Sequence, residues 1–402
     1  MLRRYNFFKN FSLKNKEFNQ NLRKARKSFK ILKSEIKNNK IPFLASFEKN
    51  YKFDFSKQKI NQFSKCKNII VIGIGGSILG TQSIYSFFGK KIKKNFFFIN
   101  NLDSNLILKY KKIKNLKNSC FIVVSKSGNT LETIANLGVI FSKKILKKRL
   151  VIITEMIDNP LMSIAKKYDA EVIEHKKFIG GRFSVLSETA MFPASLMGLN
   201  LSKFKDLKRL MSNKSFISSL IQNVAAMHTL NLKGVKNSII LNYDSSLNDL
   251  GYWYQQLVAE SLGKKGKGIT PMLSFCPKDH HSLLQLYLDG PKDKFFTFLN
   301  SQKKENNFKI SKEVISSKIN FLKGKNLDFI VDSECKATKN IFNLKKIPFR
   351  EITFYKKNEK ELGKIFTFFV LETILLSRLM NINPFDQPAV EEIKIETKIF
   401  LK

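Results

Sequence analysis

Residues 125–130 carry hydroxyl, lysine and glycine residues directly after the apolar run Phe121–Val124. This pattern predicts a buried strand, a tight turn, and a helix that begins at Leu131. The unpaired backbone N–H groups and the positive dipole end of such a helix attract an anion. The side chains that would face the anion are Ser125, Lys126, Ser127 and Thr130. We therefore predict a phosphate site here, although serine and threonine are also ordinary turn and N-cap residues, and Lys126 can equally point to solvent.

A second turn, Gly-Ile-Gly-Gly-Ser at residues 73–77, lets a ligand approach the backbone closely because glycine has no Cβ. It does not match the dinucleotide-binding fingerprint, which needs glycine where the chain has Ile78 and an acid where it has Asn100-Asn101. No Walker A motif precedes Gly89-Lys90, because the upstream position is Ile84. We predict neither a nucleotide site nor a nicotinamide site, and a tight turn without a ligand is the alternative.

Arg182 follows two glycines in the segment Ile-Gly-Gly-Arg-Phe-Ser at residues 179–184. Its guanidinium stays protonated at working pH, so it can stabilise an oxyanion that forms during a reaction. Residues 181–199 contain only one other charged residue, Glu188, which makes a merely solvated arginine the weaker interpretation.

Glu260 stands four residues after Gln256, so both side chains face the same side of a predicted helix that ends near Gly263. A carboxylate with a polar partner one turn earlier can act as a positioned general base. Taken alone, however, the spacing favours an ordinary exposed glutamate in a lysine-rich region.

Two of the four histidines are adjacent in Asp-His-His-Ser at residues 279–282. Histidine titrates near neutral pH and can open or close a hemiacetal by proton transfer. A metal-binding pair would need a spacing of four residues or a cluster of acids, so we predict no metal site. Further on, Pro388 suits the first turn of a C-terminal helix that would carry Lys394, although a lysine at any one position is common in this chain.

The elements that would position these residues alternate between short apolar runs and amphipathic segments. The runs are 69–74, 96–99, 121–124, 150–153 and 171–173, and the helical segments are 78–88, 103–112, 131–146 and 159–167. This alternation predicts an α/β fold with a parallel, doubly wound sheet. Ligands bind at the carboxyl ends of such strands, where both turns fall.

A second α/β unit is predicted from weaker signals. Its strands would be 239–241, 329–331 and 352–354, and its helices 247–262 and 362–380. We divide the chain into a helical N-terminal arm over 1–60, a first domain over 61–205, and a second domain with a C-terminal helix over 206–402.

The composition of the 402-residue chain invites a nucleic-acid hypothesis, because 72 Lys and Arg against 32 Asp and Glu give a net charge of +40. The lysines are spread along the whole length, however, which favours solvated faces over a nucleic-acid site. Four scattered cysteines form no zinc or disulfide pattern and fit a reducing cytoplasm. We find no run of 18 apolar residues, so we expect no membrane span, and residues 1–8 lack the features of a secretory signal.

In this order and spacing the motifs resemble those of the glucose-6-phosphate isomerase (phosphoglucose isomerase) family, from Gly73 to Lys394. The most specific are Gly-Ile-Gly-Gly-Ser, Gly-Gly-Arg-Phe-Ser, Glu-Ser-x-Gly-Lys and Asp-Gln-Pro-x-Val-Glu. The short chain looks like the compact bacterial type. The resemblance implies two sugar-isomerase (SIS) α/β/α sandwich domains and an enzyme of glycolysis and gluconeogenesis that needs no metal or organic cofactor.

The resemblance also implies a role for each residue. Ser125, Lys126, Ser127 and Thr130 would hold the phosphate, and Gly76 and Ser77 would line the sugar site. Arg182 would stabilise the enediolate. Glu260 would move the proton between C1 and C2, with Gln256 nearby. His281 and Lys394 would assist ring opening, and Gln387 would contact the substrate.

In the family the histidine comes from the partner subunit, so the resemblance implies a cytoplasmic homodimer with shared active sites. Many members have threonine where this chain has Asn129, so one phosphate contact is altered. His280 and His281 both remain candidates, with Ser282 favouring His281. The sequence does not decide whether mannose 6-phosphate is also a substrate. The alternatives are a non-catalytic sugar-phosphate-binding regulator and a plain nucleic-acid binder, the latter supported only by charge.

Overall fold

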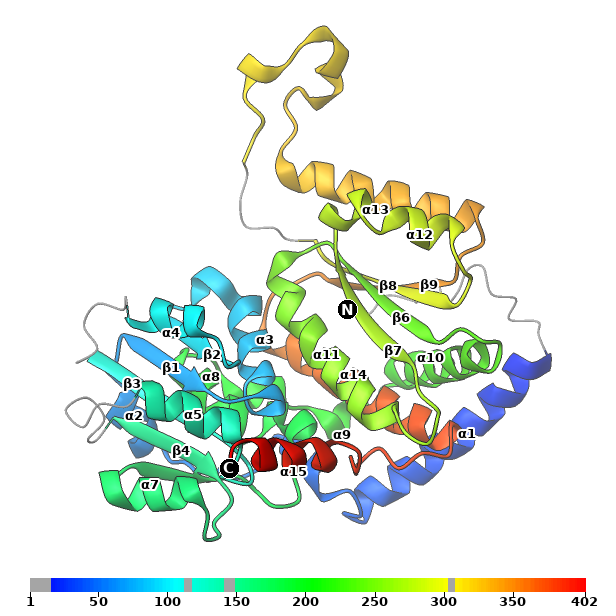
Figure 1. The fold of residues 1–402 in the computed structure, drawn as a ribbon. Coiled ribbons are helices and arrows are strands. Elements are labelled where there is room, and N and C mark those ends of the chain that lie inside the picture. The colour runs from blue at the N-terminus through cyan, green and yellow to red at the C-terminus, as the bar shows by residue number, and fades with distance from the viewer. Residues whose placement is uncertain (1–15, 112–117, 141–148, 303–307) are drawn as a thin grey trace.

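The computed structural model describes residues 16–111, 118–140, 149–302 and 308–402, and it contains two parallel β-sheets (Figure 1). The first sheet has the order β2-β1-β3-β4-β5 and the second the order β7-β6-β8-β9. Every named strand pair in both sheets is parallel. The α/β fold class predicted from the alternating pattern is therefore confirmed.

The strands are β1 Asn68–Ile72, β2 Asn95–Ile99, β3 Ser119–Val124, β4 Leu150–Thr154, β5 Glu171–Glu174, β6 Asn237–Asn242, β7 Thr270–Phe275, β8 Lys294–Ser301 and β9 Phe349–Phe354. The helices of the first half are α1 Lys16–Lys37, α2 Lys57–Ser64, α3 Leu79–Phe88, α4 Ser104–Lys111, α5 Leu131–Ile140, α7 Pro160–Tyr168 and α8 Glu188–Leu196. Those of the second half are α9 Leu207–Leu210, α10 Lys214–Leu232, α11 Asn248–Leu262, α12 Leu284–Asp289, α13 Leu327–Leu344, α14 Glu359–Leu379 and α15 Val390–Phe400.

Helices cover both faces of each sheet, which explains why β1, β3 and β4 are buried along their whole length. One face of the first sheet packs with α4, α5 and α7, and one face of the second sheet packs with α12 and α13. The other two faces belong to a single shared core that includes α3, α8, α10, α11 and α14. Helices α3 and α11 lie against each other between the sheets (Figure 1).

The strand order of the first sheet reverses between β1 and β3, because β2 pairs on the opposite side of β1. A crevice forms outside the carboxyl ends of the strands at such a point. The turn 73–77 follows β1 and the turn 125–130 follows β3, so both motifs lie at this crevice. Helix α11 approaches it from the second half of the chain.

The sequence prediction is wrong at residues 329–331, which lie in α13 and not in a strand. Asn326 caps this helix, and its side chain accepts a hydrogen bond from the backbone N–H of Phe329 at 2.8 Å. The inward residues recur at helical spacing: Val331, Cys335, Thr338 and Phe342. A three-residue apolar run therefore belonged to a longer amphipathic pattern. Strands β7 and β8 were missed.

The other predicted strands and helices are confirmed where the structure describes them. The strand predictions in the first half correspond to β1–β5, and 239–241 and 352–354 lie in β6 and β9. The predicted helix 131–146 is confirmed as far as Ile140, and residues 112 and 141–148 lie outside the described residues. Residues 1–8, where we expect no secretory signal, also lie outside them. Among the described residues, no helix is long and apolar enough to cross a membrane.

The two ends of the described chain pack differently. Helix α1 lies against α10 and α14, and the Asn21 amide donates to the Thr229 hydroxyl at 2.9 Å in a buried contact. Helix α15, by contrast, contains no buried residue and lies along the outside of the molecule (Figure 1). The domain boundaries at residues 60 and 205 stay predictions.

Candidate active site

A cavity of about 280 Å³ lies at the crevice between β1 and β3. It is lined by Ile74, Gly76, Ser77, Lys126, Ser127, Thr130, Glu155, Gly181, Arg182, Gln256, Glu260, Gln387 and Lys394. Of the predicted site residues, only Ser125 and His281 are not part of this lining. The fold thus brings together five sequence motifs that are separated by up to about 300 residues.

The turn after β3 is shaped by its own side chains. The hydroxyl of Ser125 is buried, contacts the hydroxyl of Thr130 at 2.7 Å, and accepts from the Gly128 backbone N–H at 3.2 Å. Gly128 has a φ of 68°, and a Cβ there would lie 2.0 Å from Oδ1 of Asn159. Ser125 therefore stabilises the turn from its buried side, while Thr130 lines the cavity.

Two residues of the same turn are held at the cavity rim. The Ser127 hydroxyl donates to Oδ1 of Asn129 at 2.6 Å. Asn129, which departs from the family pattern, therefore orients Ser127, a residue predicted to bind the phosphate. The Lys126 ammonium donates to the Lys177 carbonyl at 2.7 Å and lies 3.7 Å from Oε1 of Glu155. These contacts keep the ammonium beside the cavity.

The glycine turn after β1 packs backbone to backbone against the segment that carries Arg182. A Cβ on Gly76 would lie 2.2 Å from the carbonyl carbon of Gly181, so only glycine fits. The Ser184 hydroxyl donates to the Gly76 carbonyl at 3.1 Å. Gly75 has a φ of 56°, and a Cβ there would lie 2.7 Å from Nε2 of Gln256. These glycines let the two turns and α11 converge on one point.

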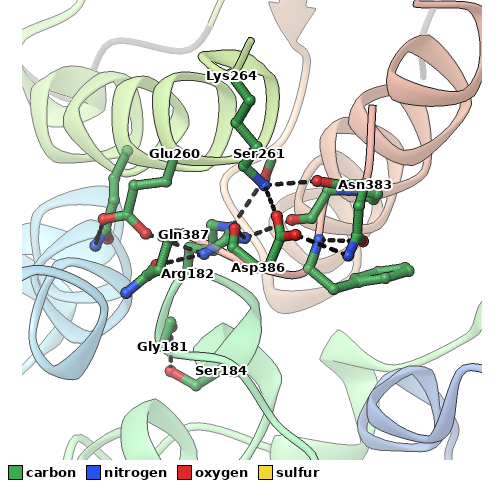
Figure 2. Close-up of polar contacts among 12 residues, drawn as sticks. Gly181, Arg182, Ser184, Glu260, Ser261, Lys264, Asn383, Asp386 and Gln387 are labelled. Atoms are coloured by element: carbon green, nitrogen blue, oxygen red, sulfur yellow. Dashed lines mark hydrogen bonds and ion pairs between the residues drawn. The ribbon is translucent and has the colours of Figure 1, made fainter. Parts of the chain in front are cut away.

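Arg182 is the most constrained side chain of the site, with only 3% of it exposed (Figure 2). Its partners come from two places, α11 and the turn that precedes α15. It donates to Ser261 Oγ at 2.9 Å, Glu260 Oε2 at 3.2 Å, Gln387 Oε1 at 2.7 Å, the Asp386 carbonyl at 3.1 Å, and the Pro384 carbonyl. Burial lowers the pKa of Arg182, and the charge of Glu260 opposes that shift. An arginine keeps its proton in such surroundings, so the site holds a fixed cation.

Glu260 joins Arg182 to Gln256. The amide of Gln256 donates to Oε1 of Glu260 at 2.8 Å, as their spacing on α11 predicts. The Gln256 Oε1 atom is buried and has no hydrogen-bond partner within the described part of the chain. About 30% of the Glu260 side chain is exposed, on the side of the cavity. This carboxylate is thus oriented by two neighbours and is still open to a ligand.

The two adjacent histidines differ in their surroundings. Nε2 of His280 lies 2.8 Å from the Tyr243 hydroxyl, whereas His281 is exposed at the end of the turn Lys278–His281 after β7. Neither lines the cavity of the same subunit. Lys394 does line it, although its ammonium also lies 2.6 Å from Oε1 of Glu391 on α15.

The comparisons with known proteins identify the family of this chain. Residues 47–399 match the sequence profile of the family described as phosphoglucose isomerase. A glucose-6-phosphate isomerase from Methanocaldococcus jannaschii is 35% identical over 353 residues, which cover 85% of this chain and 86% of that protein. The chain belongs to the phosphoglucose isomerase family.

Solved structures show the same fold for this family member. A hypothetical protein from Thermus thermophilus has a TM-score of 0.85 at 21% identity, with 99% of both chains covered. A glucose-6-phosphate isomerase from Chlamydia trachomatis has a TM-score of 0.70 at 20% identity and covers 85% of this chain and 71% of that chain. The family profile and the sequence relatives confirm the resemblance noted from the motifs, and the solved structures confirm its fold.

Several residues of the site could not be singled out from their sequence positions. Glu155 lines the cavity at the end of β4, and the carbonyls of Pro384 and Asp386 accept from Arg182. Backbone carbonyls leave no signal in a sequence. Ser261, which accepts from Arg182, could have been found, because it lies inside the Glu-Ser-x-Gly-Lys motif beside Glu260.

Proposed function

We propose that this phosphoglucose isomerase family member interconverts glucose 6-phosphate and fructose 6-phosphate. The observation that carries the proposal is the Glu260 carboxylate, which contacts Gln256 and Arg182 and lines the same cavity as the 125–130 turn. A base, a fixed cation and an anion site in one cavity suit an aldose-ketose isomerisation. The comparisons give no support to a non-catalytic regulator.

The reaction would proceed by proton transfer. Glu260 takes the proton from C2 of the open-chain aldose, and the electron pair of that C–H bond forms the C1–C2 double bond of an enediolate. The carbonyl oxygen at C1 takes up the negative charge, which the guanidinium of Arg182 stabilises. After a proton moves between the two oxygens, Glu260 returns its proton to C1 and the ketose forms. One carboxylate thus serves as base and then as acid.

The 125–130 turn would bind the phosphate at the other end of the substrate. Ser127 and Thr130 present hydroxyls to the cavity, where the Ser127 proton would turn from Asn129 to the phosphate, and Lys126 offers a positive charge. Binding energy from this remote group orients C1 and C2 against Glu260. Gly76 and Ser77 would line the sugar between the two ends, and Gln387 would contact it beside Arg182.

We infer that ring opening uses His281 from a second copy of the chain in a homodimer. His281 is exposed and does not line its own cavity, while the ring of His280 contacts Tyr243. A second cavity of about 650 Å³ shares Gln256 and Glu260 with the first, and we infer that the partner's His281 enters through it. Lys394 would assist from its own subunit. We also infer a cytoplasmic location, in keeping with four free cysteines.

The test is conversion of fructose 6-phosphate by the purified chain, followed by the reduction of NADP⁺ with added glucose-6-phosphate dehydrogenase. We expect turnover with fructose 6-phosphate. Conversion of fructose to glucose, followed separately with glucose dehydrogenase, should be at least about 10²-fold slower because fructose lacks the phosphate. Absence of turnover would refute the proposal. Mannose 6-phosphate, tested in parallel, decides whether the site also accepts the epimer at C2.

A further inference from the structure

The turn at residues 383–387 connects α14 to α15 and is built around the ammonium of Lys264. Lys264 follows the C-terminal end of α11, and Figure 2 shows its side chain reaching toward Asn383 and Asp386. Its ammonium donates to Oδ1 of Asp386 at 2.6 Å and to the Asn383 carbonyl at 2.5 Å. Only 10% of the Lys264 side chain is exposed.

The same turn is closed by its own hydrogen bonds. The Asn383 amide donates to Oδ2 of Asp386 at 3.1 Å, and the Phe385 backbone N–H donates to Oδ1 of Asn383 at 3.0 Å. Both carboxylate oxygens of Asp386 are therefore used within this small network. The hydrogen bond from Lys264 also lowers the pKa of Asp386, so this carboxylate stays ionised at neutral pH.

This turn also supplies three of the acceptors that hold Arg182. They are the Pro384 carbonyl, the Asp386 carbonyl and the side-chain Oε1 of Gln387. Lys264 stands four residues after Glu260, just beyond the C-terminal end of α11. The chain connects Glu260 to Lys264, Lys264 contacts Asp386 of the turn, the turn contacts Arg182, and Arg182 contacts Glu260. These links form a closed ring.

Helix α15 depends on the same turn. No residue of α15 is buried, and the helix begins at Val390, three residues after Gln387. Its Lys394 lines the substrate cavity. The 383–387 turn, held by Lys264, therefore attaches α15 and its Lys394 to the rest of the molecule.

We propose that Lys264 and Asp386 are positioning residues for the isomerisation. Their ion pair holds the turn so that its three acceptors fix the plane of the Arg182 guanidinium, which then faces the charge that develops on the enediolate. The proposal rests on the proposed function. It differs from an ordinary surface pair such as Lys394 with Glu391, whose side chains are both more than half exposed.

The first experiment compares Lys264→Met with Lys265→Met, the same substitution at the exposed neighbouring lysine. In Lys264→Met the turn loses the ammonium that holds it, so Arg182 is expected to shift by about 1 Å. Such a shift should lower kcat by about 10- to 100-fold and change KM by no more than about twofold. Lys264→Arg should restore most of kcat because it keeps a buried donor. Asp386→Asn, on the exposed side of the pair, should lower kcat without unfolding the chain.

The second experiment separates positioning from a structural role. Calorimetry measures binding of an aldonic acid 5-phosphate, whose carboxylate mimics the enediolate charge, and of a sugar-alcohol 6-phosphate, which is neutral at C1 and C2. In Lys264→Met we expect binding of the aldonate to weaken at least about tenfold and that of the alcohol to change no more than about twofold.

Two results would overturn the positioning role. One is a kcat of Lys264→Met within about twofold of the parent, and the other is an equal loss of affinity for both ligands in Lys264→Met. The calorimetric comparison needs no turnover. An inactive parent that binds both ligands would therefore refute the proposed isomerisation, while the ratio of the two affinities would still decide the role of Lys264.

Discussion

Nη1 of Arg182 lies 3.2 Å from Oε2 of Glu260, so the proposed base and the fixed cation of the site are in direct contact. The arginine is 3% exposed and the glutamate 30% exposed. The guanidinium therefore stays in place through its other acceptors, while the carboxylate can turn toward a substrate. In the proposed reaction an enediolate oxygen would compete with Glu260 for Nη1, which couples the proton transfer to the stabilisation of charge.

Arg182→Lys tests whether the guanidinium, and not just a positive charge, is needed. A lysine cannot donate at the same time to Ser261, Gln387 and the turn carbonyls, so its charge would be placed less well. We expect kcat to fall by about 10²- to 10³-fold, with a smaller change in KM. Steady-state kinetics provides the measurement, with Arg209→Lys as an exposed control; an Arg182→Lys enzyme as active as the control would argue against the role.

Ser127→Ala tests the phosphate end of the cavity. The Ser127 hydroxyl lines the cavity and is oriented by Asn129, so its loss should weaken phosphate binding. We expect the KM for fructose 6-phosphate to rise about 10-fold or more, as for a lost hydrogen bond to a charged group. Ser333→Ala, exposed on α13, is the matched control. An unchanged KM would place the phosphate elsewhere.

Mixed dimers test whether His281 acts across the subunit interface. Glu260→Gln and His281→Asn should each be inactive alone, because each removes one group from every site. Random reassembly makes about half of the dimers mixed, and each mixed dimer has one intact site, so about a quarter of the parental activity should return. If mixing restores no activity while each variant remains folded and dimeric, His281 does not act in trans.

Lys205 makes the stability of the fold depend on pH. It is 1% exposed, its ammonium has no hydrogen-bond partner in the described residues, and it lies over the rings of Tyr51 and Phe53. Burial lowers the pKa of Lys205 to about 7, against an ordinary value of 10.5. Between these values the unfolded chain binds more protons, so the free energy of unfolding should rise with pH, by up to about 1.4 kcal/mol per pH unit.

Urea unfolding of Lys205→Met measures this effect. The variant should be more stable than the parent at pH about 7, and the difference should shrink as the pH approaches about 10, since the parent then buries a neutral amine. The exposed Lys203→Met is the control. A stability difference that is independent of pH would contradict the assignment of the titration to Lys205.

Much of the site was predictable where the chemistry is local. Gln256 and Glu260 are four residues apart on one helix, so their contact follows from helical geometry. The turn after β3 was also predictable, because an apolar run, small hydroxyl residues and a helix start are adjacent in the sequence. The role of Ser125 inside that turn was not, since it depends on the direction of one hydroxyl.

The contacts between distant segments could not be predicted from the sequence. Arg182 lies about 200 residues from the carbonyls that accept its hydrogen bonds, and only the folded backbone brings them together. In the second sheet, β8 contains Phe-Phe-Thr-Phe-Leu at residues 295–299, a mostly apolar stretch that was a usable signal. Residues 329–331 misled, because a short apolar run fits a strand or a buried helix face equally well.

Glu260→Gln tests whether Glu260 transfers the proton between C1 and C2. Fructose 6-phosphate is incubated in D₂O with the parent, with Glu260→Gln and with Glu313→Gln, an exposed control, and the products are followed by NMR. Because the proton on Glu260 exchanges with D₂O before it is returned, we predict glucose 6-phosphate with deuterium at C2 from the parent and the control. From Glu260→Gln we predict a rate lower by about 10²- to 10⁴-fold. Conversion by Glu260→Gln at the parental rate would show that Glu260 is not the base.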